Sequence, residues 1–185
     1  MHATDPVIAH LDELQFTLAE GPCLDAYGAV AAVLVEDLRG ESSRTRWPVF
    51  ALEASAAGAA AVFAFPLVTG AVCFGVLELY RRTPGLLAAE AQQTAGVAVE
   101  ALTKVALTEL FGPESDLEIS WPARLTVEHA EVHQAAGMVA VHLATSVPDA
   151  MARLRATAYT QNTSLTELAH RVLSGQARLD KDPCS

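Results

Sequence analysis

The sequence is poor in the features that mark several large protein classes. Its three cysteines, Cys23, Cys73 and Cys184, are scattered without metal-binding spacing, which indicates reduced thiols in a cytosolic protein. The richest apolar stretch, residues 56–68, is too short to span a bilayer, and the N-terminus lacks the basic region of a signal peptide. Glycines are spread as turn residues rather than gathered in a phosphate-binding loop. We therefore expect a cytoplasmic protein with no membrane association, no metal site and no cofactor.

Basic residues are also few. The 185 residues include 12 Lys and Arg against 22 Asp and Glu, which gives a net charge of −10. Residues 1–122 contain 6 basic and 16 acidic residues, whereas residues 123–185 contain 6 of each and four of the six histidines. The whole acidic excess therefore lies in the first part. This split favours two domains and removes the main objection to a polyanion partner for the second, although it does not by itself indicate one.

The first 111 residues combine helix and strand signals. The chain is 51% hydrophobic, enough to bury a core. Apolar periodicity predicts helices at residues 5–18, 48–58 and 88–111 and strands at residues 29–35, 60–68 and 71–80. Thr69-Gly70 predicts a hairpin between the last two strands. Strands enclosed by helices predict an α+β domain.

The sequence after residue 111 shows helix signals and no strand signal. Residues 112–122 contain two prolines and three acidic residues without periodicity, and we interpret them as a linker. The helices are expected at residues 127–143, 146–162 and 164–175. Ser146 and Ser164 each stand three residues before an acidic residue, which is typical of a helix N-terminus. Residues 176–185 are expected to be a frayed tail.

Two sets of motifs resemble known domain families. Residues 14–26, with Gln15-Phe-Thr-Leu and Gly21-Pro-Cys, together with Arg46-Trp-Pro-Val-Phe and Gly75-Val-Leu-Glu-Leu-Tyr, resemble the actinobacterial GAF sensor domain. Residues 131–139, with Asp149-Ala-Met-Ala-Arg-Leu-Arg and Leu165-Thr-Glu-Leu-Ala, resemble the ANTAR module. The resemblance implies a GAF-like antiparallel sheet flanked by helices at 1–111, a linker at 112–122, an all-α three-helix module at 123–175 and a tail at 176–185.

The pairing of these domains resembles signal-responsive RNA-binding regulators that act by transcription antitermination. It implies hairpin leader transcripts as a partner, a homodimer, a small-molecule ligand for the GAF-like part, and no enzyme activity. A GAF domain has a helix and two strands ahead of the segment that starts at Gln15, so we expect an incomplete sheet. Relatives often have Lys or Thr where this chain has Ala136, and Arg where it has Thr163. We therefore expect weaker or narrower RNA binding.

Candidate RNA-binding residues lie on the first of the three rear helices. Ala130, His133, Gln134, Gly137, Ala140 and Val141 recur at a spacing of three or four, away from the Val132/Val139 stripe. A helical glycine costs about 1 kcal/mol relative to alanine, so Gly137 requires a reason. That reason is either close approach of RNA or close packing of helices, within the bundle or across a dimer. If RNA approaches, Gln134 supplies amide groups to a base edge.

The other two rear helices supply the remaining candidates. Arg153, Arg155 and Arg171 are cations for phosphate or for stacking, and Tyr159 is a stacking platform. The alternative for each is an ordinary solvated helix face. The candidate RNA-binding set is His133, Gln134, Gly137, Met138, Arg153, Arg155, Tyr159 and Arg171.

Two further functions stay open at this point. Cys23 follows Gly21-Pro22 at a possible helix start, which would stabilise a thiolate, and Cys73 lies on a predicted strand that could approach. This pair predicts a thiol-based redox sensor or a GAF-type methionine sulfoxide reductase, unless both cysteines are small buried hydrophobes. The other alternative is a dimerising scaffold that has lost RNA binding.

Overall fold

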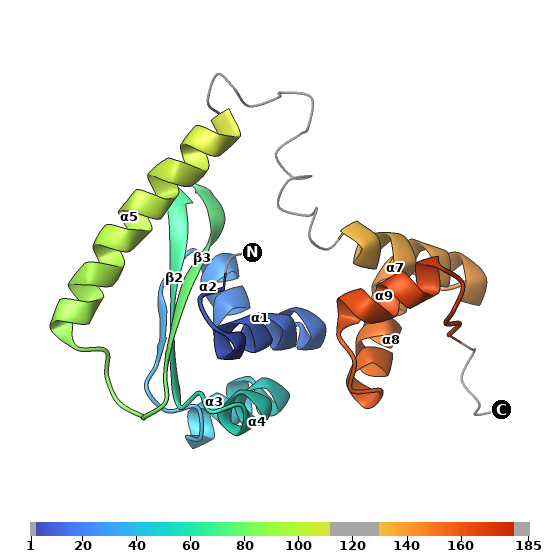
Figure 1. Ribbon diagram of the computed structural model, residues 1–185, viewed down its shortest axis with the longest axis horizontal. Coiled ribbons are helices and arrows are strands. Elements are labelled where there is room, and N and C mark those ends of the chain that lie inside the picture. Colours follow the sequence, from blue (N-terminus) through green and yellow to red (C-terminus); the bar gives the residue numbers. More distant parts are fainter. Residues whose placement is uncertain (1–2, 112–129, 180–185) are drawn as a thin grey trace. The chain divides into compact units, whose positions relative to one another are not determined.

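The computed structural model describes residues 3–111 and 130–179, which belong to two compact units (Figure 1). The front unit comprises residues 3–111 and the rear unit residues 130–179. The predicted linker at 112–122 and the first three residues of the predicted helix at 127–143 lie outside the described residues.

The front unit is a three-stranded antiparallel sheet with helices on both faces. Its elements in chain order are α1 (Pro6–Leu18), α2 (Pro22–Ala29), β1 (Val33–Val35), α3 (Glu41–Arg46), α4 (Pro48–Ala56), β2 (Ala61–Thr69), β3 (Val72–Arg81) and α5 (Ala89–Phe111). The strands are ordered β1-β2-β3, with α5 on one face and α1 and α2 on the other (Figure 1). The predicted α+β class is confirmed.

The β2–β3 hairpin is confirmed, and Gly70 occupies the left-handed region at φ 59° in its turn. The predicted strand at 29–35 is wrong over its first part, because α2 continues to Ala29. Val30 leaves this helix at φ 53°, a conformation that interrupts extended backbone, and pairing with β2 begins only at Val33. The six-residue helix α3 was not expected from the sequence, since it is too short to show a period.

Local capping interactions explain where two of the front helices begin. Asp5 accepts hydrogen bonds from the backbone N–H groups of Val7 and Ile8 at 2.8 and 3.1 Å and so caps α1. Glu20 caps α4, although it lies far from this helix in the sequence. Its side chain accepts hydrogen bonds from the N–H groups of Val49 and Phe50 at 2.8 and 2.6 Å. The core beneath these helices is apolar and consists of Leu11, Val35, Leu38, Trp47, Phe50, Ala54, Ala59 and Val62.

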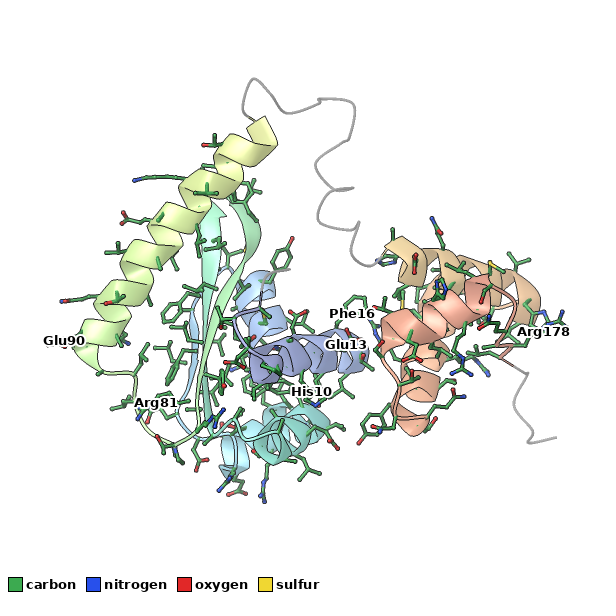
Figure 2. All side chains as sticks on the ribbon, in the orientation of Figure 1. His10, Glu13, Phe16, Arg81, Glu90 and Arg178 are labelled. Carbon is green, nitrogen blue, oxygen red and sulfur yellow. The ribbon has the colours of Figure 1, made fainter. Side chains whose placement is uncertain are left out.

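Helix α5 places small residues against the sheet and large ones outside. Ala95 and Thr103 are buried, whereas Val97, Leu102 and Val105 are 69, 42 and 54% exposed. The sequence singles out these three as principal apolar positions of the helix, and the described chain leaves them uncovered. Figure 2 shows side chains projecting outward along the length of α5, from Glu90 onward.

The rear unit packs three helices around one core: α7 (Ala130–Leu143), α8 (Val147–Thr160) and α9 (Leu165–Leu173). Both predicted N-caps are confirmed, because Ser146 Oγ accepts from the Asp149 N–H at 3.2 Å and Ser164 Oγ from the Glu167 N–H at 3.0 Å. The buried side chains include Val132, Leu143, Leu154, Ala158, Leu165, Leu168 and Val172. The expected tail is packed at its start, since Leu179 is only 8% exposed.

Candidate functional site

One side of α7 faces away from the bundle and forms a continuous exposed surface, here called the α7 face. It consists of His133, Gln134, Gly137, Met138 and Val141. Met138, in the middle of the helix, is 49% exposed, and Val141, close to its C-terminal end, is 84% exposed. The opposite side of α7 lies in the core. Ala140 was expected on the exposed side and is 7% exposed, so that prediction is wrong.

Gly137 is not explained by packing within the described bundle. A Cβ atom added to this residue would meet nothing within 4 Å. Close helix packing inside the module, one of the two reasons considered for this glycine, is therefore excluded for the described residues. Contact with RNA and contact with a second copy are the two explanations for Gly137 that stay open.

The three candidate arginines on α8 and α9 are less exposed than His133, Gln134 and Met138 on α7. Arg155 is half-buried, its Nε has no hydrogen-bond partner among the described residues, and burial lowers the pKa of its guanidinium. Arg153 is also half-buried, and Tyr159 is 45% exposed. Arg171 Nη1 donates to Gln161 Oε1 at the end of α8, at 3.4 Å. The structure thus brings the α7 candidates onto one face and distributes the others over the two remaining helices.

The two positions at which a cation was expected differ in their surroundings. Ala136 is completely buried, so a side chain there points into the helix bundle. This burial gives no support to an RNA contact at position 136, and the expectation of weaker RNA binding stays a prediction. Thr163 is partly exposed in the turn before α9, and its Oγ1 donates to Glu167 Oε2 at 2.9 Å.

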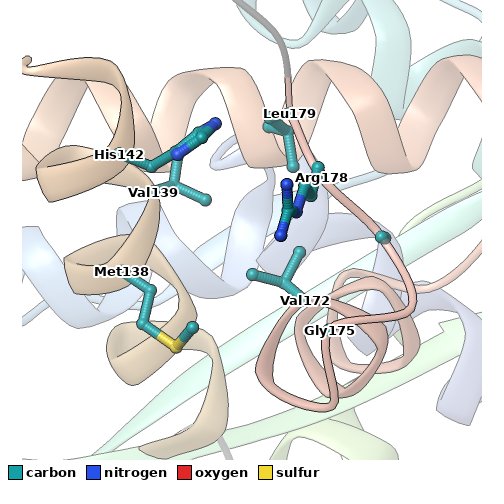
Figure 3. Close-up of a pocket in the computed structure, with 8 residues that line it drawn as sticks. Met138, Val139, His142, Val172, Gly175, Arg178 and Leu179 are labelled. Carbon is teal, nitrogen blue, oxygen red and sulfur yellow. The ribbon is translucent and has the colours of Figure 1, made fainter.

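A pocket of about 290 Å³ opens beside the α7 face, between α7, the end of α9 and the segment that follows it (Figure 3). It is lined by Met138, Val139, His142, Val172, Gly175, Ala177, Arg178 and Leu179. Only Met138 was among the predicted site residues. His142 and Arg178 were missed because they join the site through tertiary packing of a segment that the sequence presents as a tail.

The front unit contains a buried polar cluster of Gln15, Cys23 and Glu78, here called the amide cluster. Gln15 is only 2% exposed; its Nε2 donates to Glu78 Oε2 and its Oε1 accepts from the Cys23 N–H, both at 2.7 Å. One amide thus joins α1, α2 and β3. Gly21 lies so close that an added Cβ would be 2.5 Å from Gln15. Burial raises the pKa of the Glu78 carboxyl to about 7.

This environment contradicts the prediction of a reactive thiolate at Cys23. Cys23 does lie in the first turn of α2, but burial raises the pKa of its thiol and the adjacent Glu78 carboxylate raises it further. The favourable effect of a helix start is outweighed by loss of water and by a neighbouring negative charge. Cys73 is buried and its thiol donates to the Gly75 carbonyl at 3.3 Å. Neither the burial of Cys23 nor its neighbouring charge favours the redox alternative.

Comparison with protein families identifies the rear unit. Residues 126–173 match the family model of the ANTAR domain. This segment is an ANTAR domain. Such domains are RNA-binding regulatory modules of transcription antitermination, not catalytic ones. The match includes α7, α8 and α9, and with them all eight candidate RNA-binding residues.

The front unit is not identified in this way. No match to a GAF family model supports its resemblance to that domain. No curated protein and no solved structure gives a significant match to the chain. In the described ranges, no three His, Cys, Asp or Glu side chains are grouped so as to hold a metal ion. No helix in those ranges is long and apolar enough to cross a membrane.

Proposed function

We propose that the protein is a signal-responsive, dimeric regulator that binds hairpin RNA through the α7 face and acts by transcription antitermination. The observation that carries the proposal is Gly137, a helical glycine with open space at its Cβ position inside an ANTAR domain. Gly96 of α5 is open too, so openness alone is not sufficient. Gly137 differs because it lies in the RNA-binding module, beside the exposed Gln134 and Met138.

The chemistry of the α7 face suits bases that have left their stack. The Gln134 amide both donates and accepts, as a base edge requires. The absent side chain at Gly137 lets a nucleotide approach the helix backbone, and Met138 offers a polarizable thioether to an aromatic base. Arg153, Arg155 and Arg171 supply the charge that phosphates need.

Three arginines give modest, salt-sensitive affinity, so two modules acting together are an advantage. The front unit provides a means of pairing them. Val97, Leu102 and Val105 are exposed apolar residues of α5, and burying them against a second copy removes them from water. Strand β3 also lies at the edge of the sheet among the described residues. We assign dimerisation and signal reception to this GAF-like unit.

The direct test is binding of the full chain to tandem-hairpin RNAs with randomised loops, measured at two salt concentrations. We expect selected RNAs whose affinity falls steeply with salt. Gln134→Ala should weaken binding about 5- to 150-fold, the effect of hydrogen bonds worth about 1–3 kcal/mol. Gln92→Ala, which removes an exposed glutamine of α5 on another side of the helix from Val97, is the matched control and should leave binding unchanged. Failure to select any RNA refutes the function, whereas equal effects of the two variants refute the placement on α7.

Dimerisation is tested separately by sedimentation of the Val97→Glu/Val105→Glu variant. We expect a monomer that still binds a single hairpin but loses the advantage of a tandem pair. A variant that remains dimeric refutes the α5 interface. A wild-type dimer that binds no RNA supports the scaffold alternative instead.

A further inference from the structure

The pocket beside the α7 face has an apolar interior and two nitrogen-bearing side chains. Val139, Val172 and Leu179 are buried residues that line it, and Met138 adds its thioether. His142 comes from α7 and Arg178 from the segment after α9, and Figure 3 shows both projecting into the gap between these elements. Both are exposed, so a ligand reaches them directly from solvent.

The charge of the pocket distinguishes it from the rest of a protein with net charge −10. Among the eight residues that line it, none is acidic, and Arg178 is a permanent cation. The guanidinium plane of arginine and the ring of histidine are both among the groups on which unstacked RNA bases stack. An apolar interior, a planar cation and an aromatic ring together suit a flat, polarizable ligand attached to a phosphate chain.

The pocket is continuous with the α7 face. Met138 belongs to both, and His142 follows Met138 by one helical turn. Gln134 lies one turn before Met138, so Gln134, Met138 and His142 form a row along the helix. An RNA loop that lies on Gln134 and Gly137 therefore brings its next nucleotides to the mouth of the pocket.

We propose that this pocket receives one unstacked base from the loop of the bound hairpin, resting on Val139, Val172 and Leu179 and stacked against His142 and Arg178. The proposal rests on the proposed function, since it requires that the α7 face binds RNA. It gives the ANTAR domain of this chain a second point of recognition, in which the α7 face reads the edge of one base and the pocket holds the face of another.

The experiment fills the pocket and changes its cation separately. Ala177 lines the pocket while the neighbouring Gln176 does not, so Ala177→Phe inserts a ring into it and Gln176→Phe is the matched control outside. Arg178→Lys keeps the charge but removes the planar stacking surface. Both Ala177→Phe and Arg178→Lys should weaken binding of the full chain to the selected tandem hairpin about 5- to 150-fold, the range for loss of one stacked base. Gln176→Phe should bind as the unchanged protein does.

The base itself is identified by replacing each loop nucleotide in turn with an abasic one. One replacement should weaken binding to the unchanged protein and have no further effect on Ala177→Phe, because that variant has already expelled the base. Circular dichroism establishes that the variants are folded.

The outcomes separate this inference from the function on which it rests. If an RNA is selected and Gln134→Ala weakens it, but Ala177→Phe and Arg178→Lys do not, the function stands and the pocket proposal is overturned. Arg178→Ala removes both the charge and the stacking plane. If Arg178→Ala weakens binding but Arg178→Lys binds with full affinity, the pocket proposal is overturned, because Arg178 then contacts phosphate only. If every abasic replacement is additive with Ala177→Phe, the pocket holds no base. If no RNA is selected, both proposals fail.

Discussion

The two units use the same pair of residue types, glutamine and glycine, in opposite ways. In the front unit, Gln15 is buried with both ends of its amide bonded, and Gly21 leaves no room for a side chain. In the rear unit, Gln134 is exposed and Gly137 has open space. Contacts within the front unit explain Gln15 and Gly21. Contacts within the rear unit do not explain why Gln134 and Gly137 are present. Polar residues without an internal role are the better guide to a binding surface.

The comparison predicts its largest effect for Gly21→Ala. Gly21 has φ 140° and ψ 168°, a region essentially restricted to glycine, and the new Cβ would displace the Gln15 amide. We expect the free energy of unfolding of the front unit to fall by about 3 kcal/mol or more, measured by urea denaturation. RNA affinity should not change under conditions in which both units are folded, because Gly21 lies outside the RNA-binding surface and the α5 interface. A Gly21→Ala variant as stable as the unchanged protein would show that Gly21 is not required by packing against Gln15.

The second prediction concerns pH and Glu78. The pKa of this carboxyl rises by burial from its usual 4.5 to about 7, so the folded protein retains a proton that the unfolded chain releases. Stability should therefore fall as pH rises from about 4.5 to about 7, by up to about 3 kcal/mol from this group. The nearby groups Asp12 and Cys23 contribute to the same cluster.

Glu78→Gln isolates that contribution. The variant should lose this part of the pH dependence and be more stable than the unchanged protein at pH 8, measured by denaturation at a series of pH values. Exposed Glu36→Gln, just after β1, would serve as the comparison for a general charge effect. A parallel pH profile for Glu78→Gln and the unchanged protein would contradict the assignment.

A somewhat smaller loss is expected for Gln15→Ala. The substitution leaves the buried Cys23 N–H without its acceptor and Glu78 without its donor, which costs about 1–3 kcal/mol. The pKa of Glu78 should rise further, because the Gln15 hydrogen bond lowers it. Denaturation together with the pH profile measures both consequences. Gln134→Ala in the rear unit should change stability by less than about 0.5 kcal/mol.

The effect on stability expected for Gly137→Ala is small and has the opposite sign, and it tests the contrast between the two glycines most directly. Gly137→Ala should stabilise the rear unit by about 0.5–1 kcal/mol, because alanine favours helix and meets no atom there, while RNA binding weakens. Gly96→Ala on α5 is the matched control: it should also stabilise its helix, with RNA binding unchanged. Melting curves and RNA titrations of the two variants measure the pair of effects. Gly137→Ala with unaltered RNA affinity would show that this glycine serves no partner.

Local signals in the sequence predicted most of the helices and the hairpin. The hydroxyl groups of Ser146 and Ser164 and the turn at Gly70 act within a few residues, so their consequences can be predicted without the fold. Tertiary packing decided the rest. It turns Val97 outward and Ala136 inward, although the periodicity of their helices admits either orientation.

The candidate site divides in the same way. The α7 face follows from helical spacing, which predicted His133, Gln134, Gly137 and Val141 on the side away from the core and misplaced Ala140. The pocket could not be predicted, because Arg178 reaches it from a segment without helical or strand pattern. The amide cluster is also a tertiary feature: Gln15 and Glu78 are 63 residues apart in the chain.

The burial of Leu179 bears on where the folded module ends. Helix signals place its boundary at Gly175, and the family match stops at residue 173. A fragment cut at either point would remove Leu179 and one wall of the cavity lined by Val139 and Val172. The apolar side chains of Val139 and Val172 would then be exposed to water, and we expect the fragment to self-associate. Four residues beyond the last helical stop thus belong to the smallest independent piece of this protein, and fragments for binding studies should retain them.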